Sequence, residues 1–133
     1  MKYTLSIDMY SGLPMIDLKL WSKRKKIYRS MFVTIDTGAT ITTLSKDILH
    51  ILGYDAQAKG KSRITTASGV EYVDEMIIEK IMIGKLELPN IKVYAHTFPQ
   101  ESFSSGVLGL NVLRQFDIHL LFSKGKIEFE TIV

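Results

Sequence analysis

The residues of this chain whose types and spacing could do chemistry are Asp36, Thr37, Gly38 and Ala39. They follow directly on a largely apolar run, Met31 to Ile35, which is typical of a buried strand. Such a strand would fix the position of the Asp36 carboxylate. The Thr37 hydroxyl can donate and accept hydrogen bonds, and Gly38 lets backbone N–H groups approach the carboxylate. Ala39 keeps the surroundings small.

Asp-Thr-Gly after such a strand indicates either a turn that ends the strand or one half of a pair of carboxylates that hydrolyses a peptide bond. That reaction needs a water molecule made nucleophilic and a proton delivered to the leaving amine. Two carboxylates held close together can do both, because like charges at that distance cannot both ionise and the pair therefore keeps one proton. The charged partner then acts as the base and the protonated partner as the acid. Asp36 supplies one half of such a pair.

Other reaction chemistries find little support in the sequence. The chain has no Cys, which excludes disulfides, thiolate zinc sites and a Cys nucleophile. Its three histidines stand far apart without the spacing of metal ligands, at positions His50, His96 and His119. We therefore expect no metal site.

Length and composition indicate an ordinary globular protein. The chain has 133 residues, which predicts a single domain over 1–133 with a modest core. Apolar residues make up 46% and charged residues 23% of it, as in soluble proteins. No run approaches the roughly 18 apolar residues of a membrane span, and the N-terminal segment lacks the apolar stretch of a signal peptide. We therefore expect a cytoplasmic protein without a membrane partner.

The net charge is +3, and much of the excess lies in the run Lys23–Lys26. A basic cluster of this kind indicates either a patch for nucleic acid or an acidic partner, or a solvated hairpin turn. The turn is favoured because no aromatic-studded sheet pattern and no Gly-rich phosphate loop accompanies the cluster. We expect no nucleic-acid partner.

The hydrophobic pattern predicts a mostly β chain. Apolar and polar residues alternate over 16–20, and a second strand is expected over about 27–35, after the basic turn. The period changes at 45–52, where Ser45 can cap a short helix and Gly53 can end it. The remaining expected elements are a hairpin over 64–83 that turns at Ser68-Gly69, a strand over 86–94 with an edge or bulge at Pro89, a helical turn at 111–116 and a closing hairpin over 118–133.

The order of these features resembles that of single-domain retropepsin-like (retroviral-type) aspartic proteases. The resemblance covers roughly Met15 to Phe129 and is most specific at Asp36–Ala39 and in the segment GVLGLNVLRQFDIHL, residues 106–120. It implies a closed β-barrel with one or two short helices, in which these two segments lie next to each other. It also implies a flap hairpin over Ile64 to Val73 that covers a peptide or protein substrate, with its tip at Ala67, Ser68 and Gly69.

The same resemblance implies that Asp36 is catalytic, supported by Thr37, Gly38 and Ala39, and that no cofactor is needed. Pepsin-like enzymes carry two such motifs in one chain, whereas this chain has one. The active species is therefore expected to be a homodimer with its two-fold axis between two Asp36 side chains. The C-terminal strand 127–130 alternates, and it is a candidate either for pairing across the dimer or for an edge strand within its own subunit.

An alternative function of another class stays open. The same fold could serve as a non-catalytic peptide-binding or dimerisation module, since a fold does not determine function. The intact Asp-Thr-Gly favours the enzyme, because a carboxylate that faces its twin lowers stability unless it has a use. One departure from the family is Thr40, which stands where retroviral enzymes typically have an acidic residue.

Overall fold

The structure of the protein is a computed structural model, and it describes residues 1–9, 12–55, 61–66, 69–97 and 104–132. Strands dominate this part of the chain, as predicted, and its α-helices are two short segments. In chain order the elements are β1 (Lys2–Ser6), β2 (Met15–Ser22), β3 (Ile27–Ile35), β4 (Thr42–Ser45), α1 (Lys46–Ile51), β5 (Lys61–Thr66), β6 (Gly69–Ile83), β7 (Leu86–His96), β8 (Gly106–Leu108), α2 (Leu110–Leu113), β9 (Phe116–Leu121), the 3-10 helix η1 (Phe122–Lys124) and β10 (Lys126–Thr131).

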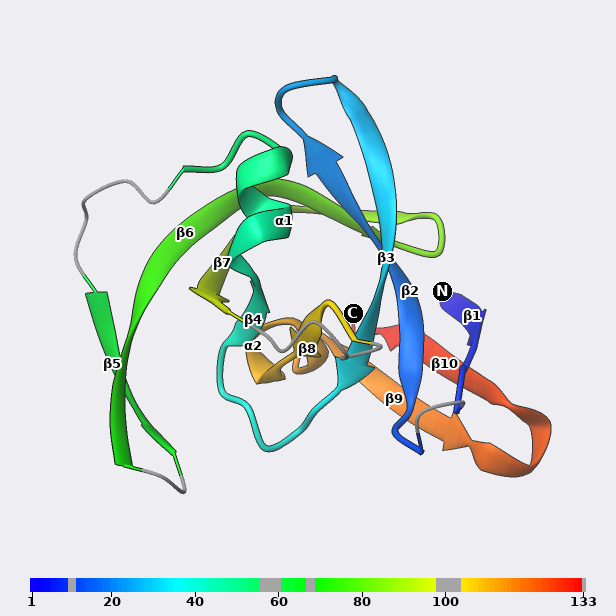
Figure 1. Cartoon of the computed structure of the whole chain (residues 1–133). Helices are drawn as coiled ribbons and strands as arrows, with labels where there is room; N and C mark the ends of the chain where they lie inside the picture. Colours follow the sequence, from blue (N-terminus) through cyan, green and yellow to red (C-terminus); the bar gives the residue numbers. More distant parts are fainter. Residues whose placement is uncertain (10–11, 56–60, 67–68, 98–103, 133) are drawn as a thin grey trace.

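A closed barrel forms the body of the described chain (Figure 1). Its strands follow one another in the order β2, β3, β8, β4, β7 and β6, and a pairing between β2 and β6 closes the ring. β5 pairs with the first part of β6 and extends beyond the barrel as a hairpin. Pro89 lies opposite Lys80 of β6, in the part of β7 that β4 does not reach. The closed barrel and the edge position of Pro89 are therefore confirmed.

The barrel interior is built from the alternating faces of its strands. In β2 the side chains of Ile16, Leu18 and Leu20 are fully buried, and the polar residues between them are partly exposed. Each buried side chain of this size stabilises the fold by about 1.5–3 kcal/mol. β2 pairs with β3 across the basic turn, and the predicted hairpin is thus confirmed.

The helix α1 begins and ends where the sequence indicated. The Ser45 side chain accepts a hydrogen bond from the Ile48 N–H at 3.4 Å, which satisfies one of the unpaired donors at the helix start. Gly53 has a left-handed φ of 94°, and its N–H donates to the carbonyl oxygen of His50. Arg24, in the basic turn, donates to the same carbonyl, as suits a cation at the end of a helix.

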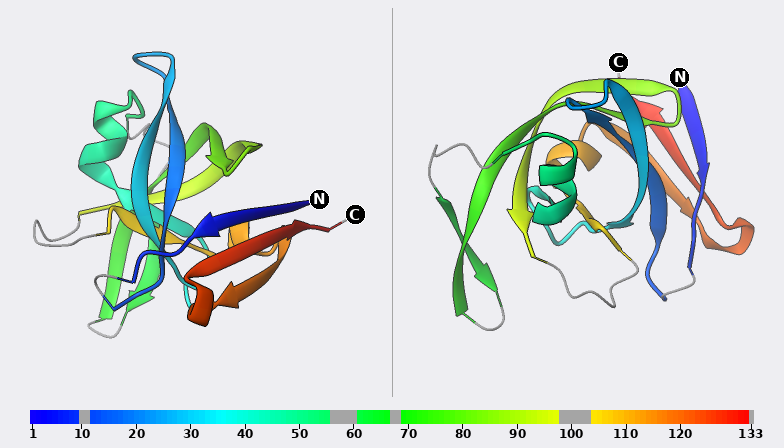
Figure 2. Two further views of the ribbon diagram at one scale, coloured as in Figure 1. Left: turned by 90° about the vertical axis from the view of Figure 1, so that its right-hand side faces the viewer. Right: turned by 45° about the horizontal axis from the view of Figure 1, so that its top comes forward.

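The two ends of the chain meet in a second sheet, which we call the terminal sheet and which consists of β1, β10 and β9 (Figure 2). β10 is its central strand: Glu128 lies opposite Thr4 of β1 on one side and opposite His119 of β9 on the other. The expectation that 127–130 pairs across a dimer, or forms an edge, is therefore wrong. Alternation shows which face of a strand is buried, but it does not show how many neighbours the strand has.

No helix among the described residues is long and apolar enough to cross a membrane.

Candidate active site

Asp36 stands at the end of β3, where the strand leaves the barrel wall. The last three residues of β3 are buried, and the Ile35 N–H donates to the carbonyl oxygen of Pro14 at 2.9 Å. The Asp36 N–H in turn donates to the carbonyl oxygen of Leu108, in β8, at 3.1 Å. Hydrogen bonds thus hold the backbone both at the last residue of β3 and at Asp36, the residue after it. The Asp36 side chain is half-buried in a fixed position.

The residues after Asp36 fold back around its carboxylate. The Gly38 N–H donates to Oδ1 of Asp36 at 2.8 Å, and the Ala39 N–H donates to the Asp36 carbonyl at 3.3 Å. A Cβ at position 38 would lie 3.1 Å from the same Oδ1, so a side chain there would crowd the carboxylate. Asp36 has no salt bridge within the part of the chain that the structure describes. Among these residues its carboxylate accepts a hydrogen bond from a backbone N–H and pairs with no cation.

Thr37 lies at the exposed tip of this loop. Its hydroxyl forms no hydrogen bond with any other residue that the structure places. The sequence-predicted residues Asp36, Thr37, Gly38 and Ala39 thus form one compact loop on the surface of the barrel end.

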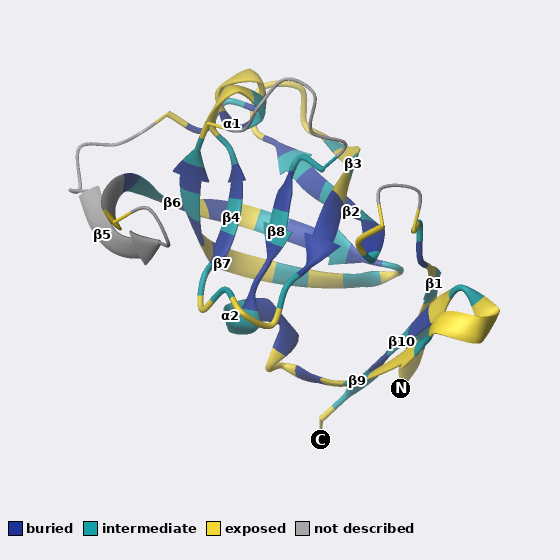
Figure 3. Cartoon of the chain, turned by 60° about the horizontal axis from the view of Figure 1, so that its bottom comes forward, coloured by how far each residue is buried: buried dark blue, intermediate teal, exposed yellow. Residues whose placement is uncertain are grey.

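The short strand β8 holds this loop against the rest of the barrel. It lies between β3 and β4, parallel to the first and antiparallel to the second (Figure 3). α2 follows directly and lies at the end of the barrel where the chain passes from β3 to β4. The Leu110 N–H donates to the Ala39 carbonyl at 2.8 Å. The two segments that carry the family resemblance are therefore in direct contact.

A partly buried polar network next to the loop, built around the buried side chain of Thr42, was not predicted. Asn111 Oδ1 accepts hydrogen bonds from both the N–H and the hydroxyl of Thr42, at 2.8 and 2.9 Å. The Thr42 hydroxyl oxygen accepts from the Gly109 N–H at 3.0 Å, and Asn111 Nδ2 donates to the Lys92 carbonyl at 2.8 Å. The network joins β4, α2 and β7 behind the Asp36 loop. Nothing local in the sequence marks it, because an Asn at the start of a helical turn is common.

The expected flap is described only in part. β5 and β6 form the hairpin, with Thr66 opposite Gly69 at its last pair. Gly69 is exposed and has a φ of 124°. Ala67 and Ser68, the other two residues of the expected tip, lie outside the described residues.

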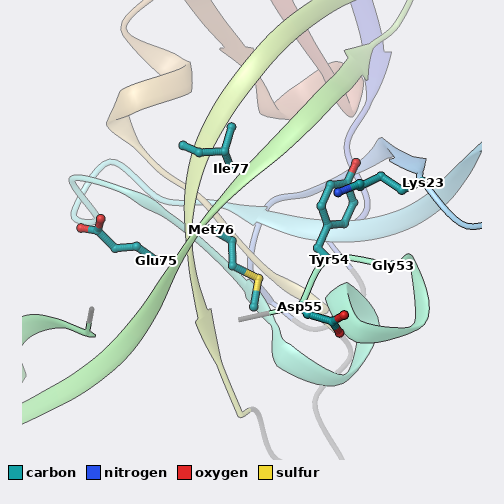
Figure 4. A pocket seen from close by; sticks show the side chains of 7 residues that line it. All are labelled: Lys23, Gly53, Tyr54, Asp55, Glu75, Met76 and Ile77. Atoms are coloured by element: carbon teal, nitrogen blue, oxygen red, sulfur yellow. The ribbon is translucent and has the colours of Figure 1, made fainter. Parts of the chain in front are cut away.

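A cavity of about 310 Å³ opens at another place, between the basic turn, the end of α1 and β6 (Figure 4). Its lining residues are Lys23, Gly53, Tyr54, Asp55, Glu75, Met76 and Ile77. Lys23 Nζ lies 5.4 Å from the centre of the Tyr54 ring, a cation–π contact that holds the basic turn to the cavity wall. None of the lining residues belongs to the Asp36 loop, so we assign the cavity no part in its chemistry.

Within the described ranges, no group of three or more His, Cys, Asp or Glu side chains could hold a metal ion. The groups that the Asp36 loop itself offers are one carboxylate, one hydroxyl and backbone N–H donors.

Comparison with known proteins agrees with this geometry. The model of the family described as gag-polyprotein putative aspartyl protease matches residues 28–115, from β3 to the end of α2. A crystal structure of a retropepsin-like aspartic protease from Rickettsia conorii superposes with a TM-score of 0.70 and 21% sequence identity, over 97% of this chain and 89% of that chain. At this identity the likeness establishes a retropepsin-like fold. No curated protein matches the sequence.

Proposed function

Because the chain belongs to the gag-polyprotein putative aspartyl protease family, we propose that it is an aspartic endopeptidase. The observation that carries the proposal is the setting of Asp36. Its carboxylate is half-buried at a rigid strand end, accepts a hydrogen bond from a backbone N–H and has no cation paired with it among the described residues. A carboxylate held in this way can lie next to a second carboxylate and share one proton with it.

The second carboxylate comes, in this proposal, from a second copy of the chain. One Asp36 cannot be base and acid in the same step, so the catalytic unit is a homodimer with a shared site. The position of Thr37 supports this, because an exposed hydroxyl without a partner among the described residues is free to bond across the axis. Thr37, Gly38 and Ala39 then support the Asp36 pair from both subunits.

The proposed reaction uses water and needs no cofactor. The charged carboxylate takes a proton from water, and the water oxygen bonds to the carbonyl carbon of the peptide. The C–N bond then breaks, and the amine leaves with the proton that the other carboxyl held. The pair begins with one proton, gains one from water and gives one to the amine, so it returns to its starting state.

The substrate is proposed to be an extended peptide segment of a protein. Strand-like backbone hydrogen bonds would hold it between the Asp36 loops and the β5–β6 hairpin. We propose that this hairpin is the flap and that Ala67, Ser68 and Gly69 lie closest to the substrate. A flap of this kind excludes water other than the reacting molecule.

The test is cleavage of a peptide library across pH by wild-type protein and by Asp36→Asn. The variant should cleave nothing, because neither subunit can supply the carboxylate base, and it should remain folded. Asp47→Asn is the matched control, since Asp47 is an exposed carboxylate in the first turn of α1; it should cleave at the wild-type rate. Substantial proteolysis by purified Asp36→Asn would refute the assignment. Peptide binding by wild-type protein without any cleavage would favour the non-catalytic module.

A further inference from the structure

A groove of about 350 Å³ opens between β3 and α1, and no residue of the Asp36 loop lines it. Its apolar lining comes from α1, from the residue after α1 and from β3: Ile48, Ile51, Leu52, Met31 and Phe32. Leu52 is buried, whereas Ile51 is 61% and Phe32 is 46% exposed. Large apolar side chains that stand in water beside one groove are typical of a surface that binds a partner.

Arg29 gives the same groove a positive charge. It lies on the same face of β3 as Met31, because side chains two residues apart in a strand share a face. Arg29 is exposed, and its guanidinium forms no hydrogen bond or ion pair with any residue that the structure describes. A guanidinium in this state can bind a carboxylate of another molecule through two parallel hydrogen bonds.

The basic turn, Lys23–Lys26, adds positive charge at the same end of the barrel (Figure 1). It is held against the end of α1, since the N–H groups of Lys23 and Arg24 donate to the Leu52 carbonyl at 2.9 and 3.3 Å. None of its four side chains forms an ion pair within the described part of the chain. No carboxylate placed by the structure therefore neutralises this turn.

The acidic side chains on and after α1 leave the positive charge of the groove in place. Asp47 lies in the first turn of α1 and Asp55 follows the helix, and neither lines the groove. Asp55 Oδ1 also lies 3.1 Å from Nδ1 of His50. The groove thus combines apolar walls with positive surroundings, which is complementary to apolar side chains that stand next to carboxylates.

Ser105 joins this groove to the Asp36 loop. It lines the groove, its N–H donates to the Phe32 carbonyl at 2.8 Å, and its carbonyl accepts from the Ser45 N–H at 3.0 Å. Ser105 directly precedes β8, which holds the Asp36 loop. Phe32 lies four residues before Asp36 in the chain, so at 3.3 Å per residue the groove begins about 13 Å from the carboxylate. An extended peptide covers that distance with about four residues.

We propose that this groove is a second contact site for the protein substrate and that it binds a segment with apolar side chains next to carboxylates. The proposal rests on the proposed function, because the bound segment belongs to the chain that is cleaved. Its apolar side chains cover Ile51 and Phe32, and one of its carboxylates pairs with Arg29. The segment lies at least about four residues from the cleaved bond. Binding there raises the local concentration of substrate at the Asp36 loop and leaves the chemical step unchanged.

The first test measures binding without cleavage. The full chain with Asp36→Asn is titrated against a labelled synthetic peptide in which leucines precede glutamates, and fluorescence anisotropy gives the dissociation constant. Arg29→Glu in the same background should raise that constant about tenfold. A second probe, with lysines in place of the glutamates, should bind the Arg29→Glu protein more tightly than its parent.

Lys85→Glu is the matched control for charge, since Lys85 is an exposed residue in the turn between β6 and β7. It changes the net charge by the same amount as Arg29→Glu and should leave the dissociation constant of the glutamate probe close to that of the parent. Equal weakening by both variants would overturn the proposal, because net charge and not the groove would then govern binding.

Ile51→Ser tests the apolar part of the groove. Because Ile51 is mostly exposed, its replacement leaves the core intact, and it should weaken binding of the glutamate probe about tenfold. Ile77→Ser is the control, since Ile77 is 56% exposed on β6, and it should bind as the parent does. Single-stranded DNA is the competing probe. DNA that binds more tightly than the peptide, with Ile51→Ser affecting neither, would assign the surface to nucleic acid and overturn the proposal.

The second test separates the groove from the catalytic site. A peptide that the wild-type protein cleaves is compared with the same peptide extended by the leucine–glutamate segment. The extended peptide should have the lower KM, and Arg29→Glu should raise that KM about tenfold at the same kcat. Equal KM values for the two peptides in the wild-type protein would overturn the proposal. Probe binding that depends on Arg29 and Ile51, without cleavage of any peptide by the wild-type protein, would support the groove and contradict the proposed function. Cleavage of both peptides that neither variant changes would do the opposite.

Discussion

Asn111 connects α2 to β4 and β7 next to the Asp36 loop. It accepts two hydrogen bonds from Thr42 and donates one to the Lys92 carbonyl. We expect Asn111→Ala to lower the free energy of unfolding by about 1–3 kcal/mol, because it leaves buried polar groups unsatisfied. Denaturant unfolding measures the change.

Gln115→Ala is the matched control. The Gln115 side chain lies exposed just after the same helix and donates to the Asn111 carbonyl. Its removal should therefore change the free energy of unfolding by less than about 0.5 kcal/mol. Equal effects of the two variants would contradict the role given to the network.

The sequence marked Asp36 as a candidate but gave no sign of the contacts that Asn111 makes. Asp36 interrupts an apolar run and is followed by a Gly, and both signals are local. The partners of Asn111 lie at 42 and 92, so its role depends on which strands become neighbours. Residue type and spacing therefore identify the carboxylate but not the polar network behind it.

At the scale of the elements, Gly106 allows the backbone of β8 to lie close to the backbone of β4. A Cβ at Gly106 would lie 2.3 Å from the Thr43 carbonyl oxygen and 2.9 Å from Leu44 Cα, and Gly106 has a φ of 154°. We expect Gly106→Ala to push β8 away from β4, and overpacking against rigid surroundings costs about 1–3 kcal/mol in addition to the strain of the backbone. Gly125→Ala is the control, because Gly125 also has a positive φ but has open space around it. Thermal unfolding should show the larger loss for Gly106→Ala; similar losses would mean that conformation and not contact with β4 matters.

The sequence predicted where helices and strands lie along the chain better than it predicted which strands pair with each other. The apolar run and basic turn gave β2 and β3, and Ser45 and Gly53 gave α1, because period and capping are local properties. The insertion of β8 between β3 and β4 joins segments about 70 residues apart and leaves no periodic signal in three residues. For the same reason the central place of β10 was missed.

At the scale of the whole molecule, a site shared by two copies makes activity depend on protein concentration. A monomer holds one Asp36 and half of the proposed catalytic pair. Well below the dissociation constant the dimer population grows as the square of total protein, and once dimers dominate it grows linearly. Specific activity should therefore rise with concentration and then level off.

Thr37→Ala should raise the protein concentration at which specific activity levels off, which we call the crossover. The reason is that the Thr37 hydroxyl is proposed to hydrogen-bond across the two-fold axis of the dimer. The shift should correspond to about 1–3 kcal/mol, the cost of leaving a buried partner unsatisfied. Thr40→Ala is the matched control, since Thr40 is another exposed threonine of the same loop, and it should leave the crossover in place. Turnover per chain is measured from nanomolar to micromolar protein, with sedimentation on the same samples. Constant specific activity in samples shown to be monomeric would refute the shared site, because the acid that acts with Asp36 would then have to come from the same chain.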